Sequence, residues 1–360
     1  MQTVRLPPLQ HRLLSAAIRA PSGDNSQPWS FKFEGLERLL IYAEWERSTS
    51  LFDFQNTGTY LSVGAVIENI RIQAAHEGLD TEVTYPKAGS DLDPLVALRF
   101  CPSPDLSVTA ATVKAMLTRT VTRRPFVPWP PAFHKMERIL ADAVSGPGVR
   151  VFRRRNDIAR WARLVVLGDL VRFTHPVLHE DVMSRILLTK ESAERMRVGL
   201  EIDRLGLGPL AASLIRFLRP WDRVEHLIRW GIHRVFAEQS RALILSSGAL
   251  LLVTVPDQSP EDWIRAGEQV ERMWIRAHEQ GLCVHPITIA LYLDLRYQHE
   301  GVQRFLPEHE PLLQEIRKTL AELIPDGTGA MLFRLGYGWR MSHPAIRLPV
   351  EQFVRPSTTG

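Results

Sequence analysis

The sequence predicts an α+β fold made of two tandem repeats, with a helical insertion in the second. Three observations carry this prediction: one helical segment occurs twice, β-rich segments flank both copies in the same order, and a long helical stretch occurs only in the second unit. The chain has 360 residues, 45% of them hydrophobic and 23% charged, which suffices for a sizeable core of the ordinary globular class.

The repeated segment reads GAVIENIRIQAAHEGL from Gly64 to Leu79 and GEQVERMWIRAHEQGL from Gly267 to Leu282, an offset of 203 positions (267 − 64). Apolar residues at helical spacing and a closing glycine predict two helices, each with a buried face and a left-handed C-cap. Two similar amphipathic helices could also arise by chance. A repeat is favoured because the flanks agree as well.

Each copy follows a β-rich segment, 39–42 or 250–255, and precedes an extended one, 81–85 or 283–289. We therefore expect two units, residues 1–110 and 111–360, that pair within the chain as an intrachain pseudo-dimer.

The insertion covers about 157–247 and contains Trp221 and Trp230 among arginines. An amphipathic basic helix can lie on a membrane surface, but such a segment more often covers another part of its own protein. We expect a lid or an interface.

The net charge of +4 comes from arginines spread along the chain, with no nucleic-acid-binding motif beside them. No apolar run is long enough for a signal peptide or a bilayer span. We expect a cytoplasmic protein without a nucleic-acid or membrane partner. Cys101 and Cys283 lack metal-ligand spacing, so we expect packing thiols and no metal site.

The segment Ala20–Trp29 reads APSGDNSQPW and lies between an expected helix, 9–19, and an expected strand, 29–33. It resembles the APSxxNxQPW signature of the FMN-dependent nitroreductase superfamily. The residue types suit a flat ring with polar edges, because Asn25 offers donors and acceptors, Ser22 offers either, and Gly23 lets the backbone approach closely. A plain turn-forming loop is the alternative.

The segment Arg119–Phe126, RTVTRRPF, is similar to the Arg-x-Ser-x-Arg/Lys-x-Phe element that grips the FMN phosphate in that family. Forked guanidinium donors and a hydroxyl suit a phosphate dianion. Anchoring on the phenylalanine aligns Thr122 with the serine and Arg124 with the basic residue, and leaves Arg119 to replace the first arginine. A basic linker turn is the alternative.

Two late segments also resemble family elements. GLCVHPIT, 281–288, is similar to the stretch along the reactive N5 edge of the flavin, and PAIRLP, 344–349, to a phosphate-touching Lys-x-Arg-x-Pro with Ala345 in place of lysine. Active nitroreductases often carry Glu-Gly where this chain has Thr288-Ile289. An isoleucine there could narrow access for a nicotinamide.

The elements are complementary between the units. The first unit has no arginine element, and the second has only AVSGPG, 143–148, where the APS loop is expected. The resemblance is therefore closest to the fused, Acg-like branch, and it implies a nitroreductase-like fold with one FMN site between the halves. The implied cofactor-binding residues are Pro21, Ser22, Gly23, Asn25, Gln27, Arg119, Thr122, Arg123, Arg124, Pro286, Ile287, Thr288 and Arg347.

The resemblance implies a flavin-dependent oxidoreductase that passes hydride through N5 between NAD(P)H or another donor and a small flat electrophile or a specific metabolite. No catalytic side chain is required, and Arg124 is the candidate for stabilising the reduced ring at N1. We expect His175, His179 and His285 to be structural or lid residues. The alternative is a non-enzymatic FMN-binding or storage protein with an occluded flavin. Either would be a monomer or a homodimer.

Overall fold

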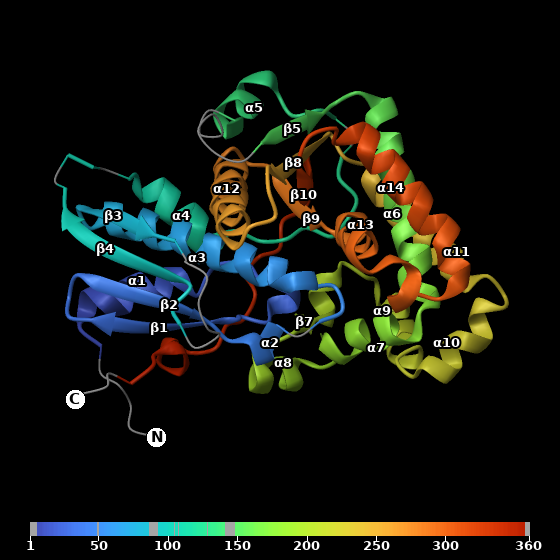
Figure 1. Cartoon of the computed structure of the whole chain (residues 1–360), viewed down its shortest axis with the longest axis horizontal. Coiled ribbons are helices and arrows are strands. Elements are labelled where there is room, and N and C mark those ends of the chain that lie inside the picture. The colour runs from blue at the N-terminus through green and yellow to red at the C-terminus, as the bar shows by residue number, and fades with distance from the viewer. Residues whose placement is uncertain are drawn as a thin grey trace.

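The computed structural model describes residues 6–48, 50–85, 93–103, 105–106, 108–127, 129–140 and 148–356. Figure 1 shows two sheets on either side of a central pair of helices, with a helical region beside the second sheet. Helices and strands mixed in this way confirm the predicted α+β class.

The two sheets have the same strand order and the same pairing. The first contains β1 (Trp29–Glu34), β2 (Arg38–Ala43), β3 (Leu79–Thr84) and β4 (Val96–Pro102), in the order β1-β2-β4-β3. The second contains β5 (Val149–Phe152), β8 (Ala249–Val255), β9 (Cys283–Ile287) and β10 (Thr328–Gly336), in the order β5-β8-β10-β9. Every neighbouring pair in both sheets is antiparallel.

The central helices are α3 (Thr57–His76) and α12 (Pro260–Glu279), which contain the two copies of the repeated segment. In each case the helix lies between the second and third strands of its sheet along the chain. The smaller helices α1 (Pro8–Ala17), α2 (Trp45–Ser48), α4 (Ala110–Thr118) and α5 (Phe133–Leu140) surround them.

Where α3 crosses α12, the backbones touch. A Cβ atom on Gly64 would lie 1.9 Å from the carbonyl oxygen of Ile264, and one on Gly267 would lie 2.1 Å from that of Leu61. Leu61 and Ile264 are 203 positions apart (264 − 61), as the two glycines are, so the contact is reciprocal. Only glycine permits so close a crossing at these two positions.

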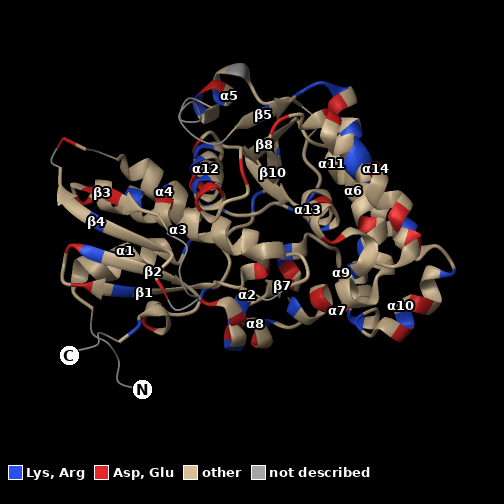
Figure 2. Cartoon of the chain, in the orientation of Figure 1, with Lys and Arg blue, Asp and Glu red and all other residues tan. Residues whose placement is uncertain are grey.

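The crossing also joins the two cores. Ile264 of α12 packs in the core of the first sheet with Phe31 and Ile67, whereas Leu61 of α3 packs in the core of the second. Arg272 donates to Glu68 at 2.7 and 2.9 Å, and Arg71 pairs with Glu268. Charges of both signs accordingly lie along α12 in Figure 2.

The helical region at 155–245 lies between β5 and β8. It contains α6 (Arg155–Thr174), α7 (Pro176–Arg185), α8 (Lys190–Met196), α9 (Pro209–Phe217), α10 (Trp221–Ile228) and α11 (Ile232–Leu245), with the short parallel pair β6 (Ile186–Leu187) and β7 (Leu200–Glu201). We call it the cap. Two further helices, α13 (Ile289–Glu300) and α14 (Glu310–Leu323), lie between β9 and β10.

The last described segment returns to the first sheet. After β10 the chain runs past the APS loop, and Val354 then pairs with Phe31 of β1 in a parallel bridge. The backbone amide of Arg355 donates to the carbonyl of Phe31 at 2.7 Å. This C-terminal tail, 343–356, ties the second half of the chain to the first.

We predict that Gly64→Ala lowers the free energy of unfolding by about 3 kcal/mol, because the added methyl group overpacks the helix crossing. Alanine favours the helix over glycine by about 1 kcal/mol, which is too little to offset this cost. Urea unfolding followed by circular dichroism measures this change. The control is Gly208→Ala, where a Cβ meets no atom within 4 Å and φ is −73°. A Gly64→Ala protein as stable as the control would contradict the backbone contact.

Candidate functional site

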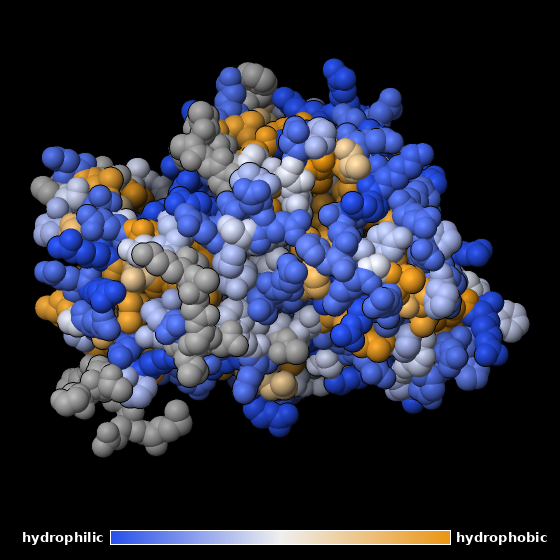
Figure 3. Space-filling model, in the orientation of Figure 1, coloured by the Kyte–Doolittle hydropathy of each residue, from blue (hydrophilic) through white to orange (hydrophobic). Residues whose placement is uncertain are grey.

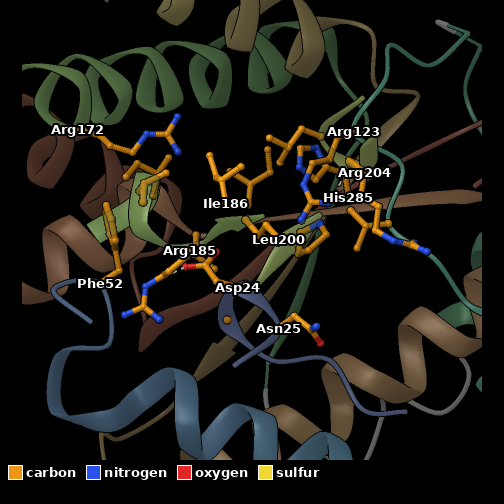
Figure 4. A pocket seen from close by; sticks show the side chains of 18 of the residues that line it. Asp24, Asn25, Phe52, Arg123, Arg172, Arg185, Ile186, Leu200, Arg204 and His285 are labelled. Atoms are coloured by element: carbon orange, nitrogen blue, oxygen red, sulfur yellow. Dashed lines mark hydrogen bonds and ion pairs between the residues drawn. The ribbon is translucent and has the colours of Figure 1, made fainter. Parts of the chain in front are cut away.

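A cavity of about 720 Å³ lies between the two halves and the cap. The APS loop, the arginine element, the end of β9, the C-terminal tail and the cap helices all line it. Figure 4 shows Arg123, Arg204 and His285 on one side of this cavity and Phe52, Arg172 and Arg185 on the other. Its size is that of a cofactor or small-molecule site.

The cavity brings together most of the residues that the motifs single out. The lining residues among them are Pro21, Ser22, Gly23, Asn25, Arg119, Arg123, Pro286, Ile287, Thr288 and Arg347. Gln27, Thr122 and Arg124 are not among the residues that line it.

Gln27, Thr122 and Arg124 have surroundings other than the cavity. Gln27 is fully buried, donating from Nε2 to the carbonyl of Arg197 at 2.7 Å and accepting from the amide of Leu348 at 3.0 Å. Thr122 is buried beside Val284, to whose carbonyl its amide donates at 2.9 Å. Arg124 is exposed. Its placement therefore gives no support to the predicted role at flavin N1.

Asn25 fastens the APS loop. Its Nδ2 donates to the carbonyls of Arg197 at 3.2 Å and Ile346 at 3.1 Å, and its Oδ1 accepts from Arg347 at 2.5 Å. Both amide hydrogens are thus used within the chain, so the expectation that Asn25 presents donors to a ring does not describe this structure. Its backbone is left-handed, with φ of 57°.

Arg347 fastens the same loop from the tail. Its Nε donates to the carbonyl of Ile18 and its Nη2 to that of Ala20, both at 2.9 Å. Arg204 of the cap holds the tail in turn, donating to the carbonyls of His343 at 2.9 Å and Pro344 at 2.6 Å. The cavity wall is therefore assembled from the APS loop, the cap and the tail together.

Four guanidinium groups share this wall: Arg19, Arg119, Arg204 and Arg347. Two carboxylates face them among the described residues, because Arg119 Nε donates to Glu271 at 2.6 Å and Arg204 Nε to Glu201 at 2.7 Å. We call these four residues the arginine cluster. Arg19 Nε is buried and has no hydrogen-bond partner within the described part of the chain.

The arginine cluster carries an excess of buried positive charge. Burial, and then the charges of Arg119 and Arg204, lower the pKa of Arg19 to about 10. Burial and the charge of Arg19 likewise hold the pKa of Arg347 well below its ordinary value. Depressed guanidinium pKa values of this origin indicate a place where a bound anion would be stabilised.

His285, in the middle of β9, is neutral at physiological pH. Burial and the charge of Arg334 hold its pKa well below the ordinary value, and Arg334 Nη1 donates to its Nδ1 at 2.9 Å. Because arginine can only donate, the proton of the imidazole lies on Nε2. His285 can therefore offer a hydrogen-bond donor to the cavity.

His175 and His179 form hydrogen bonds with backbone groups. His175 caps α7, where its Nδ1 accepts from the amide of Leu178, and Nε2 of His179 contacts the carbonyl of Arg219 at 3.1 Å. Burial lowers the pKa of both. His179 lines the cavity and His175 does not.

The motifs missed Arg19 and Arg204. Arg19 precedes the APS loop directly, so its position beside a ligand loop was a usable signal. Arg204 comes from a cap segment that resembles no motif, and nothing in its local sequence singles it out.

No helix within the described ranges is long and apolar enough to span a bilayer. The same residues contain no group of three histidine, cysteine, aspartate or glutamate side chains that could hold a metal ion. Cys101 and Cys283 are both free thiols.

No family model matches the chain. It is 27% identical over 332 residues to the uncharacterized protein MT1398 of Mycobacterium tuberculosis (strain CDC 1551 / Oshkosh), covering 91% of this chain and 46% of that protein. It is 30% identical over 207 residues to the uncharacterized protein Rv3127 of M. tuberculosis (strain ATCC 25618 / H37Rv), covering 52% and 59% respectively. The chain thus spans about half the length of the first curated relatives it matches.

A third relative is the "Putative NAD(P)H nitroreductase acg" of M. tuberculosis (strain ATCC 25618 / H37Rv), 29% identical over 138 residues, or 38% of this chain and 40% of that protein. The resemblance to the nitroreductase superfamily and its Acg-like branch, predicted from the motifs, is confirmed.

Solved structures with a similar fold include a nitroreductase-like family protein from Bacillus cereus, 11% identical, with a TM-score of 0.36 and coverage of 70% of this chain and 98% of that one. Another is an FMN-bound nitroreductase from Desulfitobacterium hafniense DCB-2, 13% identical, with a TM-score of 0.32 and coverage of 67% and 96%. Likenesses as loose as these do not locate a site.

We predict that replacing Asn25 releases the APS loop from the tail. Asn25→Ala and Asn25→Gly both lose the three side-chain hydrogen bonds, but alanine also pays about 1 kcal/mol or more for the left-handed backbone. Both variants should therefore be less stable than the wild type, and Asn25→Ala the less stable of the two, in urea unfolding. Wild-type stability in Asn25→Ala would show that these bonds do not hold the loop.

Proposed function

We propose that the chain binds one FMN in the cavity, with its phosphate at the arginine cluster. The observation that carries the proposal is the excess of buried positive charge there, four guanidinium groups against two carboxylates. A phosphate dianion would balance it, and forked guanidinium groups are the usual partners of phosphate oxygens. The unpartnered Nε of Arg19 offers a donor for such an oxygen.

The residues for the ring lie on the same cavity. Gly23 leaves open space in front of its backbone, since a Cβ there would meet no atom within 4 Å. Ser22 accepts from the amide of Gln27 at 2.9 Å, so its hydroxyl hydrogen remains available. Pro286, Ile287 and Thr288 form the facing edge, with the Nε2 hydrogen of His285 as a further donor.

FMN, when bound, supplies hydride transfer through its N5 atom. The chain would bind the phosphate, orient the ring between the APS loop and the end of β9, and keep water from its face with the cap. We propose on this basis an oxidoreductase of nitroreductase type, with NAD(P)H or another donor. The likeness to the Acg relative supports this reading at the level of the family.

We also infer that the chain is a duplicated unit, with halves near 1–110 and 111–360. The supporting observations are the identical strand order of the two sheets and the reciprocal glycine contact between α3 and α12. A two-fold-related contact is expected to be reciprocal in this way. The first half supplies the APS loop, and the second supplies Arg119, the end of β9 and Arg347.

A duplicated unit has a second, equivalent position, and a polar hollow lies there. Four of its lining residues, Arg71, Tyr85, Asp262 and Arg265, correspond at the 203-residue offset to cavity residues Trp274, Thr288, Thr59 and Ser62. Its arginines are balanced by acidic groups, because Arg71, Arg150, Arg265 and Arg272 each pair with a carboxylate. This hollow thus differs in charge from the arginine cluster. We therefore propose one FMN per chain. Residues 143–147, where the second unit is predicted to lack an APS loop, lie outside the described residues.

One observation favours the alternative, an FMN-binding or storage protein with an occluded flavin. Ile289, directly after the proposed N5 edge, packs against Gly168 of cap helix α6. A Cβ atom on Gly168 would lie only 3.0 Å from Cγ1 of Ile289. Contact between the cap and this edge restricts room over the ring.

We predict that Arg19→Gln weakens FMN binding at least about tenfold, because one charge-assisted phosphate contact is lost, and leaves riboflavin binding unchanged because riboflavin has no phosphate. Titration of flavin-free protein, followed by flavin fluorescence, measures both. Arg12→Gln is the control, since Arg12 lies on α1, two residues beyond whose end Arg19 stands, but pairs on the surface with Glu77 at 2.8 Å. If Arg19→Gln lowered the affinity for both flavins equally, the phosphate would not bind at the arginine cluster. A wild-type protein that binds neither flavin would refute the proposed function.

Reduction of the bound flavin by NAD(P)H distinguishes an oxidoreductase from a storage protein. If the protein is an NAD(P)H-dependent enzyme, anaerobic NADH or NADPH bleaches the blue absorption band of the bound flavin within seconds, whereas dithionite bleaches it in either case. Ile289→Gly, which opens the contact with Gly168, should accelerate the nucleotide reaction. Bleaching by dithionite alone, in both proteins, would favour the storage protein.

A further inference from the structure

The cavity does not end at the segments proposed to hold FMN. It continues between α7, α9, α10 and α11, where its walls are mostly aliphatic and aromatic. We call this part the cap compartment. Its apolar lining residues are Met183, Leu214, Ile215, Ile228, Ile232 and Phe236.

The cap compartment differs in chemistry from the arginine cluster. Leu214, Ile215, Ile228 and Ile232 are half-buried, so these apolar side chains reach the cavity instead of packing fully into a core. Phosphates and ribose hydroxyls find few partners on such walls, whereas an alkyl chain removes apolar surface from water there. The occupant of this part is therefore apolar.

Two polar atoms in the same walls lack partners among the described residues: Arg172 Nε and His233 Nδ1. Arg172 is already neutralised by Asp169, whose carboxylate accepts from its Nη2 at 2.6 Å. Its free Nε hydrogen can donate to an uncharged acceptor such as a carbonyl oxygen without requiring an anion. Burial and the charge of Arg234 lower the pKa of His233, which keeps that ring neutral at physiological pH.

Aromatic surface lies next to these polar groups. Phe173 and Phe236 pack with their ring centroids 5.5 Å apart, and the guanidinium of Arg172 lies over Phe173 at 4.6 Å. Figure 4 shows the Arg172 guanidinium directed into the cavity, beneath the cap helices. Such a shelf suits a flat head group that carries a hydrogen-bond acceptor.

We propose that the cap compartment binds the apolar tail of an uncharged carbonyl compound, such as an alkyl-substituted enone or quinone, whose flat head lies toward the proposed flavin end of the cavity. The position of the head rests on the proposed function, and the tail site does not. Apolar side chains also gather on the outer face over α9 and α10 in Figure 3.

Calorimetric titration with 2-methylcyclohexenone and 2-decylcyclohexenone tests the proposal, on flavin-free and on FMN-loaded protein. The longer tail should raise affinity at least about thirtyfold and make the heat-capacity change of binding more negative, because both follow apolar burial. Ile215→Trp and Ile232→Phe fill the compartment from α9 and α11 and should reduce the tail-dependent gain below about threefold. Leu210→Trp is the control, since Leu210 lies on α9 but is 88% exposed.

The results separate this inference from the proposed function. The inference is wrong if the longer tail adds no affinity in the wild type. It is also wrong if the gain in affinity persists in both Ile215→Trp and Ile232→Phe, and both conclusions hold even if FMN binds. A tail-dependent gain in flavin-free protein that never takes up FMN would support the compartment and refute the flavin site. Loss of the gain in Leu210→Trp as well would place tail binding on the outer face of α9 and overturn the inference.

Discussion

The contact of α3 with α12 is the constraint on which the rest of the molecule depends. Two helices whose backbones touch at Gly64 and Gly267 leave almost no freedom in their crossing. Because each helix also inserts one residue into the core of the other half, Leu61 in one direction and Ile264 in the other, neither sheet can complete its core alone. The distance between the APS loop and the end of β9, and so the cavity between them, is set by this crossing.

The cavity wall is held by arginines that bind backbone carbonyls across great separations in sequence. Arg347 reaches Ile18 and Ala20, and Arg204 reaches His343 and Pro344. Each carbonyl accepts a hydrogen bond from a guanidinium group but does not neutralise its positive charge. The donors in the wall are therefore largely satisfied while its positive charge remains in excess, which suits an anion-binding site better than a purely structural role.

Much of the fold could be predicted from the sequence because its signals are local. The repeated segment lies in α3 and α12, and the extended segments after it are β3 and β9. The candidate site could be predicted only in part. Motif matching located Ser22, Arg119 and Thr288 on one cavity, but it assumed that Asn25 and Arg124 face the ligand. The direction of the Asn25 side chain depends on Arg197, Ile346 and Arg347, which are distant in sequence. Arg204 follows no local pattern.

The C-terminal tail has a consequence for how the cavity wall forms. The wall around the APS loop is complete only when Arg347 lies against Ile18 and Ala20, which are 329 and 327 positions away in the sequence. The APS loop and its flanking helix therefore cannot form this wall by themselves. Capture of a ligand at the arginine cluster is in this way tied to the folding of the first and the second sheet together.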